Sequence, residues 1–285
     1  MNDKPFLFLY WENPPDKMMP AYIALCRVVI EYHCSDMNIQ IIGPDNIHHW
    51  LPDLPPRIND VTCTSNPDKI SLAIKTGFIR IFLLEKYGGI YLDSDSIPLK
   101  TLSFLWEICK KGGFTALRRS TAPTKHIANN LLACTPENDI IKQIAAVLRE
   151  KITQKISFEW GEIGAYTLTP IVDAHLNKCT IIPEHQAHPI VSENVYLFMS
   201  ETLEPENILY NDTFNVMLFH KPFHGPSPAI PEYGIEADKN GWLNTWDIDR
   251  LYYGNILLSK IFRKAIPEKI FIDKYENIIK LMKKE

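Results

Sequence analysis

The sequence predicts an α/β fold in which helices cover a mostly parallel sheet. Up to about residue 180, short apolar segments typical of strands alternate with longer segments whose apolar residues recur at helical spacing. The 285 residues are 46% hydrophobic and carry a formal net charge of −4. This composition is typical of a globular protein that buries a large core, and it argues against a protein that coats nucleic acid.

These patterns predict the elements in chain order. We expect strands near residues 5–11, 38–43, 60–64, 90–93, 113–118 and 127–134, and helices near residues 20–33, 69–87, 138–155 and 162–177. Beyond about residue 180 the chain becomes proline-rich and loop-like, and no internal repeat is visible. Loops of that length would form lids or the walls of an acceptor site.

The helix expected at 69–87 is the most strongly marked element. Ile74, Phe78 and Ile81 fall on one face of it. Asn66-Pro67-Asp68 offers the proline and the acidic residue that favour a helix start. Gly88-Gly89 can adopt the positive φ of a helix end. The sequence therefore predicts a packed helix that ends on two glycines.

Two carboxylates follow this helix. Ile90-Tyr91-Leu92 is short, apolar and strand-like, and it leads to Asp93 and Asp95, which point the same way from an extended backbone. Such a pair can hold a hard divalent cation that also binds a diphosphate. An isolated Asp-x-Asp is more often a solvated turn, but its place after a helix, a double glycine and an apolar strand favours a metal site.

This stretch resembles the sugar-binding region of the Asp-x-Asp glycosyltransferases of family 32, which are related to capsular polysaccharide synthesis proteins. The residues that carry the resemblance are Thr76-Gly77, Arg80, Leu83-Leu84, Tyr87-Gly88-Gly89 and Tyr91-Leu92-Asp93-Ser94-Asp95. A weaker similarity extends over about residues 5–225, beginning with the apolar run that ends in Tyr10-Trp11.

The resemblance implies a GT-A type fold, Mn²⁺ or Mg²⁺ as cofactor, and transfer of a sugar from a nucleoside-diphosphate donor, here a UDP-sugar, with retention at the anomeric carbon. The acceptor would be an oligosaccharide or a lipid-linked saccharide in capsule, O-antigen or related surface glycan synthesis. It implies catalytic roles for Asp93, Asp95 and Arg80. The residues expected to bind the nucleotide sugar are Tyr10, Trp11, Thr76, Gly77, Arg80, Tyr91, Asp93, Ser94 and Asn130.

Gly77 departs from the family pattern, which has at this position an aspartate that binds donor-sugar hydroxyls together with the arginine. Glycine inside a helix costs about 1 kcal/mol relative to alanine, so its presence indicates close packing or extra room. The donor sugar would then differ from glucose, or another acid would fill the role.

His220 is the candidate for a third protein contact, either to the metal or to the diphosphate, since it ends the strand-like run from Val216 to Phe219. The alternative is an ordinary surface or hydrogen-bonded histidine. His220 and His224 have the spacing of a zinc pair, but Lys221-Pro222 interrupts any helix between them and the sequence has no H-E-x-x-H motif.

The C-terminal segment differs in charge from the rest of the chain. We expect a catalytic domain over residues 1–250 and a basic amphipathic helical segment over 251–285, which carries eight Lys or Arg against four Asp or Glu. Such a segment either packs its apolar stripe on the catalytic domain or lies on an anionic membrane.

The expected location is the cytoplasm, at most peripheral on the inner face of the membrane. The chain has no secretory signal and no apolar run of membrane-spanning length. The six cysteines have no paired spacing and are expected to be reduced thiols.

The residues are also compatible with two other functions. A metal-dependent nucleotidyl or phosphoryl transferase could also use an Asp-x-Asp pair, although no Gly- and Lys-rich phosphate loop is present. A noncatalytic sugar-binding protein with a degenerate site is the other alternative, which Gly77 makes possible.

Overall fold

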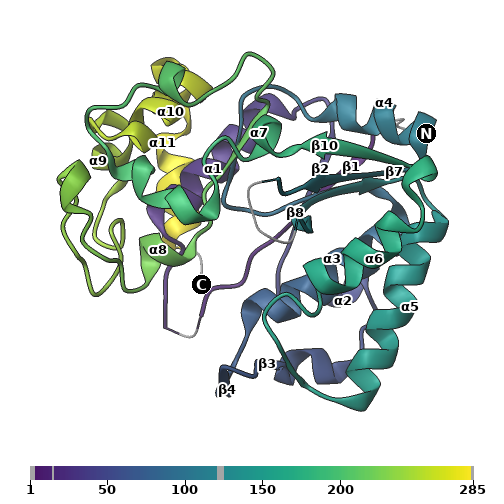
Figure 1. Ribbon diagram of the computed structural model, residues 1–285. Coiled ribbons are helices and arrows are strands. Elements are labelled where there is room, and N and C mark those ends of the chain that lie inside the picture. The colour runs from purple at the N-terminus through teal and green to yellow at the C-terminus, as the bar shows by residue number, and fades with distance from the viewer. Residues whose placement is uncertain (1–3, 15, 121–124, 284–285) are drawn as a thin grey trace. The chain divides into compact units, whose positions relative to one another are not determined.

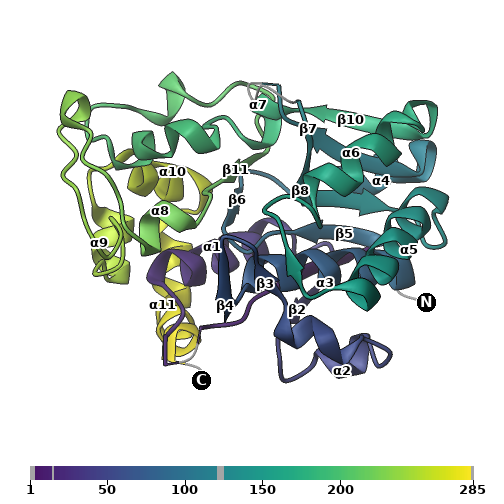
Figure 2. The same cartoon turned by 60° about the horizontal axis from the view of Figure 1, so that its bottom comes forward.

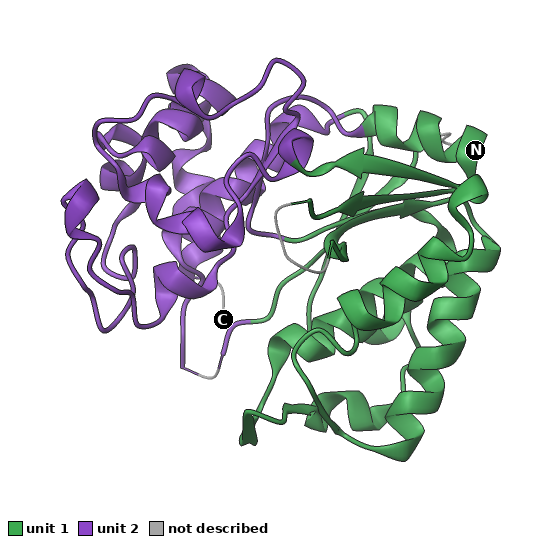
Figure 3. Cartoon of the chain, in the orientation of Figure 1, with its two compact units in different colours: residues 1–12, 36–93, 103–184 green, residues 13–35, 94–102, 185–285 purple. Residues whose placement is uncertain are grey.

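The computed structural model describes residues 4–14, 16–120 and 125–283 of the chain (Figure 1). It divides into two compact units, shown in different colours in Figure 3. The first unit comprises Met1–Glu12, Asp36–Asp93 and Ser103–Glu184, and the second comprises Asn13–Ser35, Ser94–Leu102 and His185–Glu285. The chain therefore passes from the first unit to the second within the Asp93-Ser94-Asp95 motif.

The first unit contains the central sheet and the helices that cover its two faces. Its elements are β1 (Phe6–Tyr10), β2 (Asn38–Ile42), α2 (Ile47–Trp50), η1 (Pro56–Asp60), β3 (Thr62–Cys63), β4 (Asn66–Ile70), α3 (Leu72–Tyr87), β5 (Gly89–Leu92), α4 (Ser103–Gly112), β7 (Phe114–Arg118), β8 (Ile127–Cys134), α5 (Asp139–Gln154), β9 (Ser157–Phe158), α6 (Ala165–Asp173), η2 (Leu176–Lys178) and β10 (Cys179–Pro183).

The central sheet has the strand order β10-β7-β8-β5-β1-β2 within the described residues. Only β8 runs antiparallel to its two neighbours, whereas the other three pairings are parallel. Helix α4 packs on one face of the sheet, and α3, α5 and α6 lie on the other (Figure 1). The predicted α/β fold with a mostly parallel sheet is confirmed.

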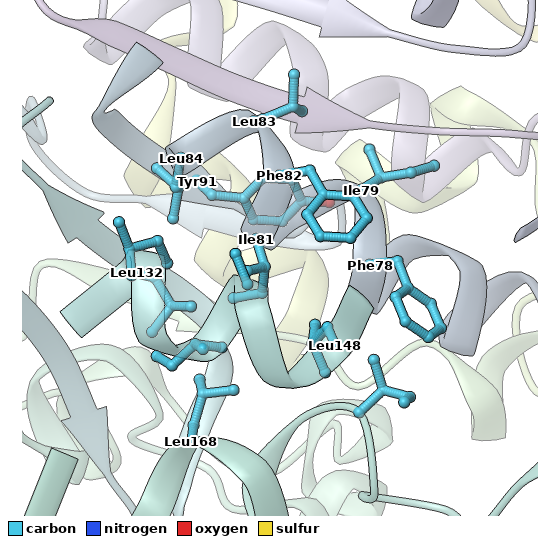
Figure 4. Packing of buried hydrophobic residues seen from close by; sticks show 14 of the residues in the cluster. Phe78, Ile79, Ile81, Phe82, Leu83, Leu84, Tyr91, Leu132, Leu148 and Leu168 are labelled. Atoms are coloured by element: carbon cyan, nitrogen blue, oxygen red, sulfur yellow. The ribbon is translucent and has the colours of Figure 1, made fainter. Parts of the chain in front are cut away.

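Helix α3 forms the centre of the core. Its side chains Phe78, Ile81 and Phe82 belong to one buried cluster with Leu132 of β8 and Leu148 of α5 (Figure 4). All five side chains are at most 5% exposed, and burial of such side chains contributes about 1.5–3 kcal/mol each. This packing fixes the helix that carries Arg80 against the strand that leads to Asp93.

The predicted start of this helix is wrong. Asn66-Pro67-Asp68 belongs to β4, which pairs antiparallel with β3 at the edge of a small separate sheet, and an edge strand tolerates proline. The helix begins at Leu72, because the Ser71 side chain accepts the hydrogen bond of the Ile74 N–H. Its predicted end is right: Gly88 caps it with φ +62°, where a Cβ would lie 2.4 Å from the Pro136 nitrogen.

The second unit is mainly helical. Its elements are α1 (Ala21–His33), β6 (Ser96–Pro98), α7 (Glu184–Ala187, whose first residue belongs to the first unit), η3 (Ser192–Met199), η4 (Pro205–Asn207), β11 (Asn215–Met217), α8 (Lys221–His224), η5 (Pro231–Tyr233), α9 (Ile248–Tyr253), α10 (Leu257–Ala265) and α11 (Glu268–Lys283). Strands β6 and β11 form an antiparallel pair (Figure 2). The region expected as loops therefore contains short helices and one short strand.

The apolar stripe of the C-terminal segment is buried inside the second unit. Phe271 and Ile278 of α11 are 1% and 0% exposed, α11 packs against α1, and the ring of Phe271 stacks on that of Tyr252 with centroids 3.9 Å apart. Phe271 and Ile278 are therefore packed within the second unit, and contact of this segment with a membrane stays a prediction.

All six cysteines are free thiols, as expected, and none of them forms a disulfide. Across the described residues, no helix has the length and apolar character required to cross a membrane.

Candidate functional site

Asp93 lies immediately after β5 and is held by the first unit. Its backbone N–H donates to the carbonyl oxygen of Asn130 on β8 at 2.8 Å, and its carboxylate forms an ion pair with the Arg80 guanidinium. The Arg80 side chain is 4% exposed and that of Asp93 is 23% exposed. Arg80 and Asp93, which the family resemblance assigned to one site, are therefore in contact.

Arg80 lies between Asp93 and the ring of Tyr91, whose centroid is 4.6 Å from the guanidinium carbon. Burial lowers the pKa of Arg80, but the charges of Asp93 and Tyr91 and their hydrogen bonds outweigh this effect, so the pKa is raised overall. Burial also raises the pKa of Asp93, and Arg80 opposes this shift only in part. Tyr91 is 0% exposed, so its ring supports the guanidinium from within the core.

Asp95 is held by the second unit. Its backbone carbonyl accepts the Leu218 N–H at 3.0 Å, and its Oδ2 accepts the His220 N–H at 2.9 Å. Asp95 is 7% exposed, as is Ser94. The segment that follows β11 thus fixes both the backbone and the carboxylate of Asp95.

Between those two N–H groups, Phe219 has a φ of +54°. A bulky residue rarely adopts this left-handed conformation, and it costs of order 1–3 kcal/mol. The turn at Phe219 allows the amides on both sides of it to reach Asp95. A strained residue of this kind beside an acidic motif points to a functional site. The composition and periodicity of the sequence do not reveal such strain.

His220 is partly exposed, and its Nδ1 is hydrogen-bonded to the hydroxyl of Tyr22 on α1. Burial, and to a smaller extent the charge of His224, lower the pKa of His220 to about 4; the two histidine rings stack with centroids 5.6 Å apart. Burial raises the pKa of Tyr22 well above its usual value, and Asp95 adds to this shift. At neutral pH both groups are therefore uncharged.

The donor set suits a hard cation. Asp93 and Asp95 carry carboxylate oxygens, which Mn²⁺ and Mg²⁺ prefer, and His220 contacts Asp95 through its backbone N–H. Among the residues that the structure describes, however, no three His, Cys, Asp or Glu side chains are grouped closely enough to hold a metal ion. The carboxylate of Asp93 is instead directed at Arg80.

The residues at the start of α3 pack inside the first unit. The Thr76 hydroxyl donates to the Leu72 carbonyl at 2.7 Å. A Cβ on Gly77 would lie 3.0 Å from Cγ2 of Ile163. Of the two interpretations of Gly77, close packing is the one that the structure shows. Asn130 is 5% exposed and contributes its backbone carbonyl to Asp93.

A second buried ion pair lies at the end of β1, where the sequence predicted contacts from Tyr10 and Trp11. Lys75 of α3, 6% exposed, places its Nζ 2.7 Å from Glu12 Oε2. The Tyr10 hydroxyl donates to the same oxygen at 2.5 Å. Trp11 is partly exposed, and its backbone N–H donates to Ile42 at 3.0 Å.

Sequence reasoning missed Lys75, Glu12 and Tyr22. The signal for Lys75 was a lysine among the apolar residues of a buried helix, and the signal for Glu12 was an acid directly after an apolar strand. Tyr22 gave no local signal, because its partner His220 is 198 positions away in the chain.

Comparisons with known proteins place the first part of the chain in a family. The sequence model of the family described as "Capsular polysaccharide synthesis protein" matches residues 1–158, which include Arg80, Asp93 and Asp95. A curated protein of Legionella pneumophila, "Subversion of eukaryotic traffic protein A", is 28% identical over 126 residues. This match covers 44% of the present chain but only 17% of the Legionella protein.

Solved structures of glycosyltransferases are among the structural matches. "PaToxG Glycosyltransferase" has 16% identity and a TM-score of 0.47, with 61% of this chain and 70% of that chain covered. The glycosyltransferase GlyE of Streptococcus pneumoniae TIGR4 has 13% identity and a TM-score of 0.49, with 96% of this chain and 64% of that chain covered.

Proposed function

This chain belongs to the capsular polysaccharide synthesis protein family, and from that premise we propose that it is a metal-dependent, retaining glycosyltransferase of the GT-A type. The donor is a UDP-sugar, and the acceptor is an oligosaccharide or a lipid-linked saccharide in surface glycan synthesis. The observation that carries the proposal is the pairing of Arg80 with Asp93 at the end of a buried strand, within the Asp-x-Asp motif.

Asp93 and Asp95 hold the divalent cation in this proposal, and His220 supplies a further contact, to the metal or to the diphosphate. When bound, Mn²⁺ or Mg²⁺ neutralises the charge that develops on the leaving diphosphate. Support for this role of Asp95 comes from two hydrogen bonds, one to its backbone carbonyl and one to its carboxylate, which fix the residue before any ligand arrives.

Arg80 binds the donor sugar or its phosphates. Its guanidinium is pre-oriented by Asp93 and by the ring of Tyr91, and its Nε has no hydrogen-bond partner among the described residues. A buried donor without an acceptor costs free energy, so a ligand oxygen placed there would satisfy it. The planar guanidinium suits phosphate and paired hydroxyl groups.

The nucleoside lies against Trp11 and Tyr10 in this proposal, at the carboxyl end of β1, where α/β sheets bind nucleotides. Tyr91, Thr76 and Gly77 shape the donor site from within the core, and Ser94 and Asn130 contribute through the backbone that carries the acidic motif. The enzyme works in the cytoplasm, at the inner face of the membrane when its acceptor is lipid-linked.

The test is hydrolysis of a panel of nucleotide sugars with Mn²⁺ in the absence of acceptor. The proposal predicts slow hydrolysis of one UDP-sugar, abolished by a chelator and restored by added metal. Turnover of nucleoside triphosphates instead would identify a nucleotidyl or phosphoryl transferase. Binding of sugars without any turnover would identify a noncatalytic sugar-binding protein.

A further inference from the structure

The carboxylate of Glu12, directly after β1, is held by one of its two oxygens. Its Oε2 accepts both the Lys75 ammonium, at 2.7 Å, and the Tyr10 hydroxyl, at 2.5 Å. The other oxygen, Oε1, has no hydrogen bond to any residue that the structure describes, and it is not buried. The Glu12 side chain is 21% exposed, whereas that of Lys75 is 8% exposed. The protein therefore fixes Oε2 and leaves Oε1 accessible to a ligand.

This ion pair lies at the edge of the sheet where the parallel strands end. Strands β1 and β5 are parallel, and α3 leads directly into the amino end of β5. The first turn of α3, which contains Lys75, therefore lies beside the carboxyl end of β1, where open α/β sheets bind nucleotides. Burying two charges costs free energy that an apolar contact between α3 and β1 would not. The cost favours a role in binding over a merely structural link.

We infer that Glu12 binds the ribose of the donor nucleotide through Oε1, and that Lys75 and Tyr10 are positioning residues that hold its carboxylate. The inference rests on the proposed function, in which the nucleoside lies against Trp11, the residue before Glu12. A carboxylate accepts hydrogen bonds, and the two neighbouring hydroxyl groups of a ribose donate them. The N3–H of uracil is a poorer partner, because the carbonyl oxygens on both sides of it repel a carboxylate. The site therefore selects ribonucleotide sugars over deoxyribonucleotide sugars.

The first test needs only the parent protein. Calorimetric titration with UDP and with 2′-deoxy-UDP, both in the presence of Mn²⁺, measures the contribution of the 2′-hydroxyl group to binding. Because a hydrogen bond to a charged acceptor is among the stronger ones, we expect 2′-deoxy-UDP to bind roughly tenfold more weakly than UDP. Equal affinities would overturn the inference, and the ion pair of Glu12 with Lys75 would then only join α3 to β1.

The second test asks whether the preference for UDP depends on Glu12. In Glu12→Gln, Lys75 can only donate, so it keeps the amide oxygen and turns the N–H₂ group, which accepts no hydrogen bond, toward the ribose. The tenfold preference should largely disappear. Glu12→Leu combined with Lys75→Met removes both charges together, leaves no ammonium without a partner, and should lose the preference equally. Tyr10→Phe, which removes one of the two contacts to Oε2, should give an intermediate preference. The matched control is Glu107→Gln on α4, where the side chain is 61% exposed, and it should keep the full preference.

A tenfold preference that survives in the Glu12 variants would overturn the inference. So would an equal loss of affinity for both ligands, which would place Glu12 against the base or the phosphates. An unchanged preference in Tyr10→Phe would remove Tyr10 as a positioning residue. Failure of the parent protein to bind UDP would instead contradict the proposed donor class, and the ribose contact with it. A parent that binds UDP and 2′-deoxy-UDP equally well leaves the donor class intact and overturns only the role of Glu12, so the two failures are distinguishable.

Discussion

Asp93 and Asp95 belong to one motif but have different neighbours. Asp93 faces the buried cation of Arg80, whereas Asp95 accepts a hydrogen bond from a backbone amide. An asparagine at 95 keeps an acceptor oxygen for that amide, but an asparagine at 93 leaves Arg80 without its counter-charge. The two isosteric substitutions should therefore have different effects on stability and the same effect on transfer.

We predict that Asp95→Asn abolishes transfer and leaves the melting temperature of the metal-free protein within a few degrees of the parent. Asp93→Asn should also abolish transfer but lower the free energy of unfolding by about 2–3 kcal/mol, somewhat below the range for a fully buried pair because Asp93 is 23% exposed. Thermal melts in chelator and a transfer assay check both effects. Full activity in either variant would rule that carboxylate out as a metal ligand.

For Arg80, the substitution to lysine separates donor binding from structural support. Lys keeps the positive charge beside Asp93 but cannot form the two parallel contacts of a guanidinium. We expect Arg80→Lys to lose much of the donor affinity, with a smaller change in the melting curve. If the affinity for the donor is unchanged while the stability drops markedly, Arg80 is only the structural partner of Asp93.

The packing around Gly77 leads to a prediction about the choice of donor sugar. An aspartate there needs Ile163 to give way, since even a Cβ would lie 3.0 Å from its Cγ2. We expect Gly77→Asp alone to be destabilised, and Gly77→Asp with Ile163→Ala to accept the side chain and change the ranking of a panel of nucleotide sugars. Ile163→Ala alone is the control for the enlarged space. Identical rankings in the parent and the double variant would mean that Gly77 only serves packing.

At the scale of elements, the sequence correctly predicted the helices and strands that are marked by neighbouring residues in the chain. Helix α3 was predicted through its apolar face and its double glycine, and β5 through its apolar run, so Arg80 and Asp93 could be placed near one another. The start of the helix was predicted wrongly because the residues before it form β4, which depends on pairing with β3. Such pairing cannot be recognised from the local sequence, which is also typical of a helix start. The contacts of Lys75 with Glu12 and of Tyr22 with His220 join residues distant in the chain, so periodicity could not predict them.

Helix α11 is predicted to be structural. Deleting the residues after Ala265 removes the buried side chains of Phe271 and Ile278, so the truncated protein should be unstable or insoluble. Phe271→Ala in the full chain should lower the free energy of unfolding by about 3–5 kcal/mol. Lys274→Ala, an exposed position on the same helix, should have little effect. A truncated protein as stable as the parent would contradict this role.

At the scale of the whole molecule, the net charge of −4 includes a local excess of cations after Leu251. Because the apolar stripe there is buried, attraction to a membrane can come only from the lysine and arginine side chains, and salt screens such attraction within about 10 Å at 0.1 M. We predict weak flotation with anionic vesicles at low salt that disappears at physiological salt. Binding that persists at high salt would mean that the stripe leaves the protein to enter the bilayer.

The left-handed backbone at Phe219 limits how this segment can vary. Only glycine, and to a lesser degree asparagine or aspartate, adopts that conformation readily, while a β-branched residue fits it worst. Substitution tolerance at this position is therefore set by backbone geometry and not by the size or polarity of the side chain. A related sequence with valine or isoleucine here would have to follow a different chain path past the aspartate, and one with glycine could keep the same path.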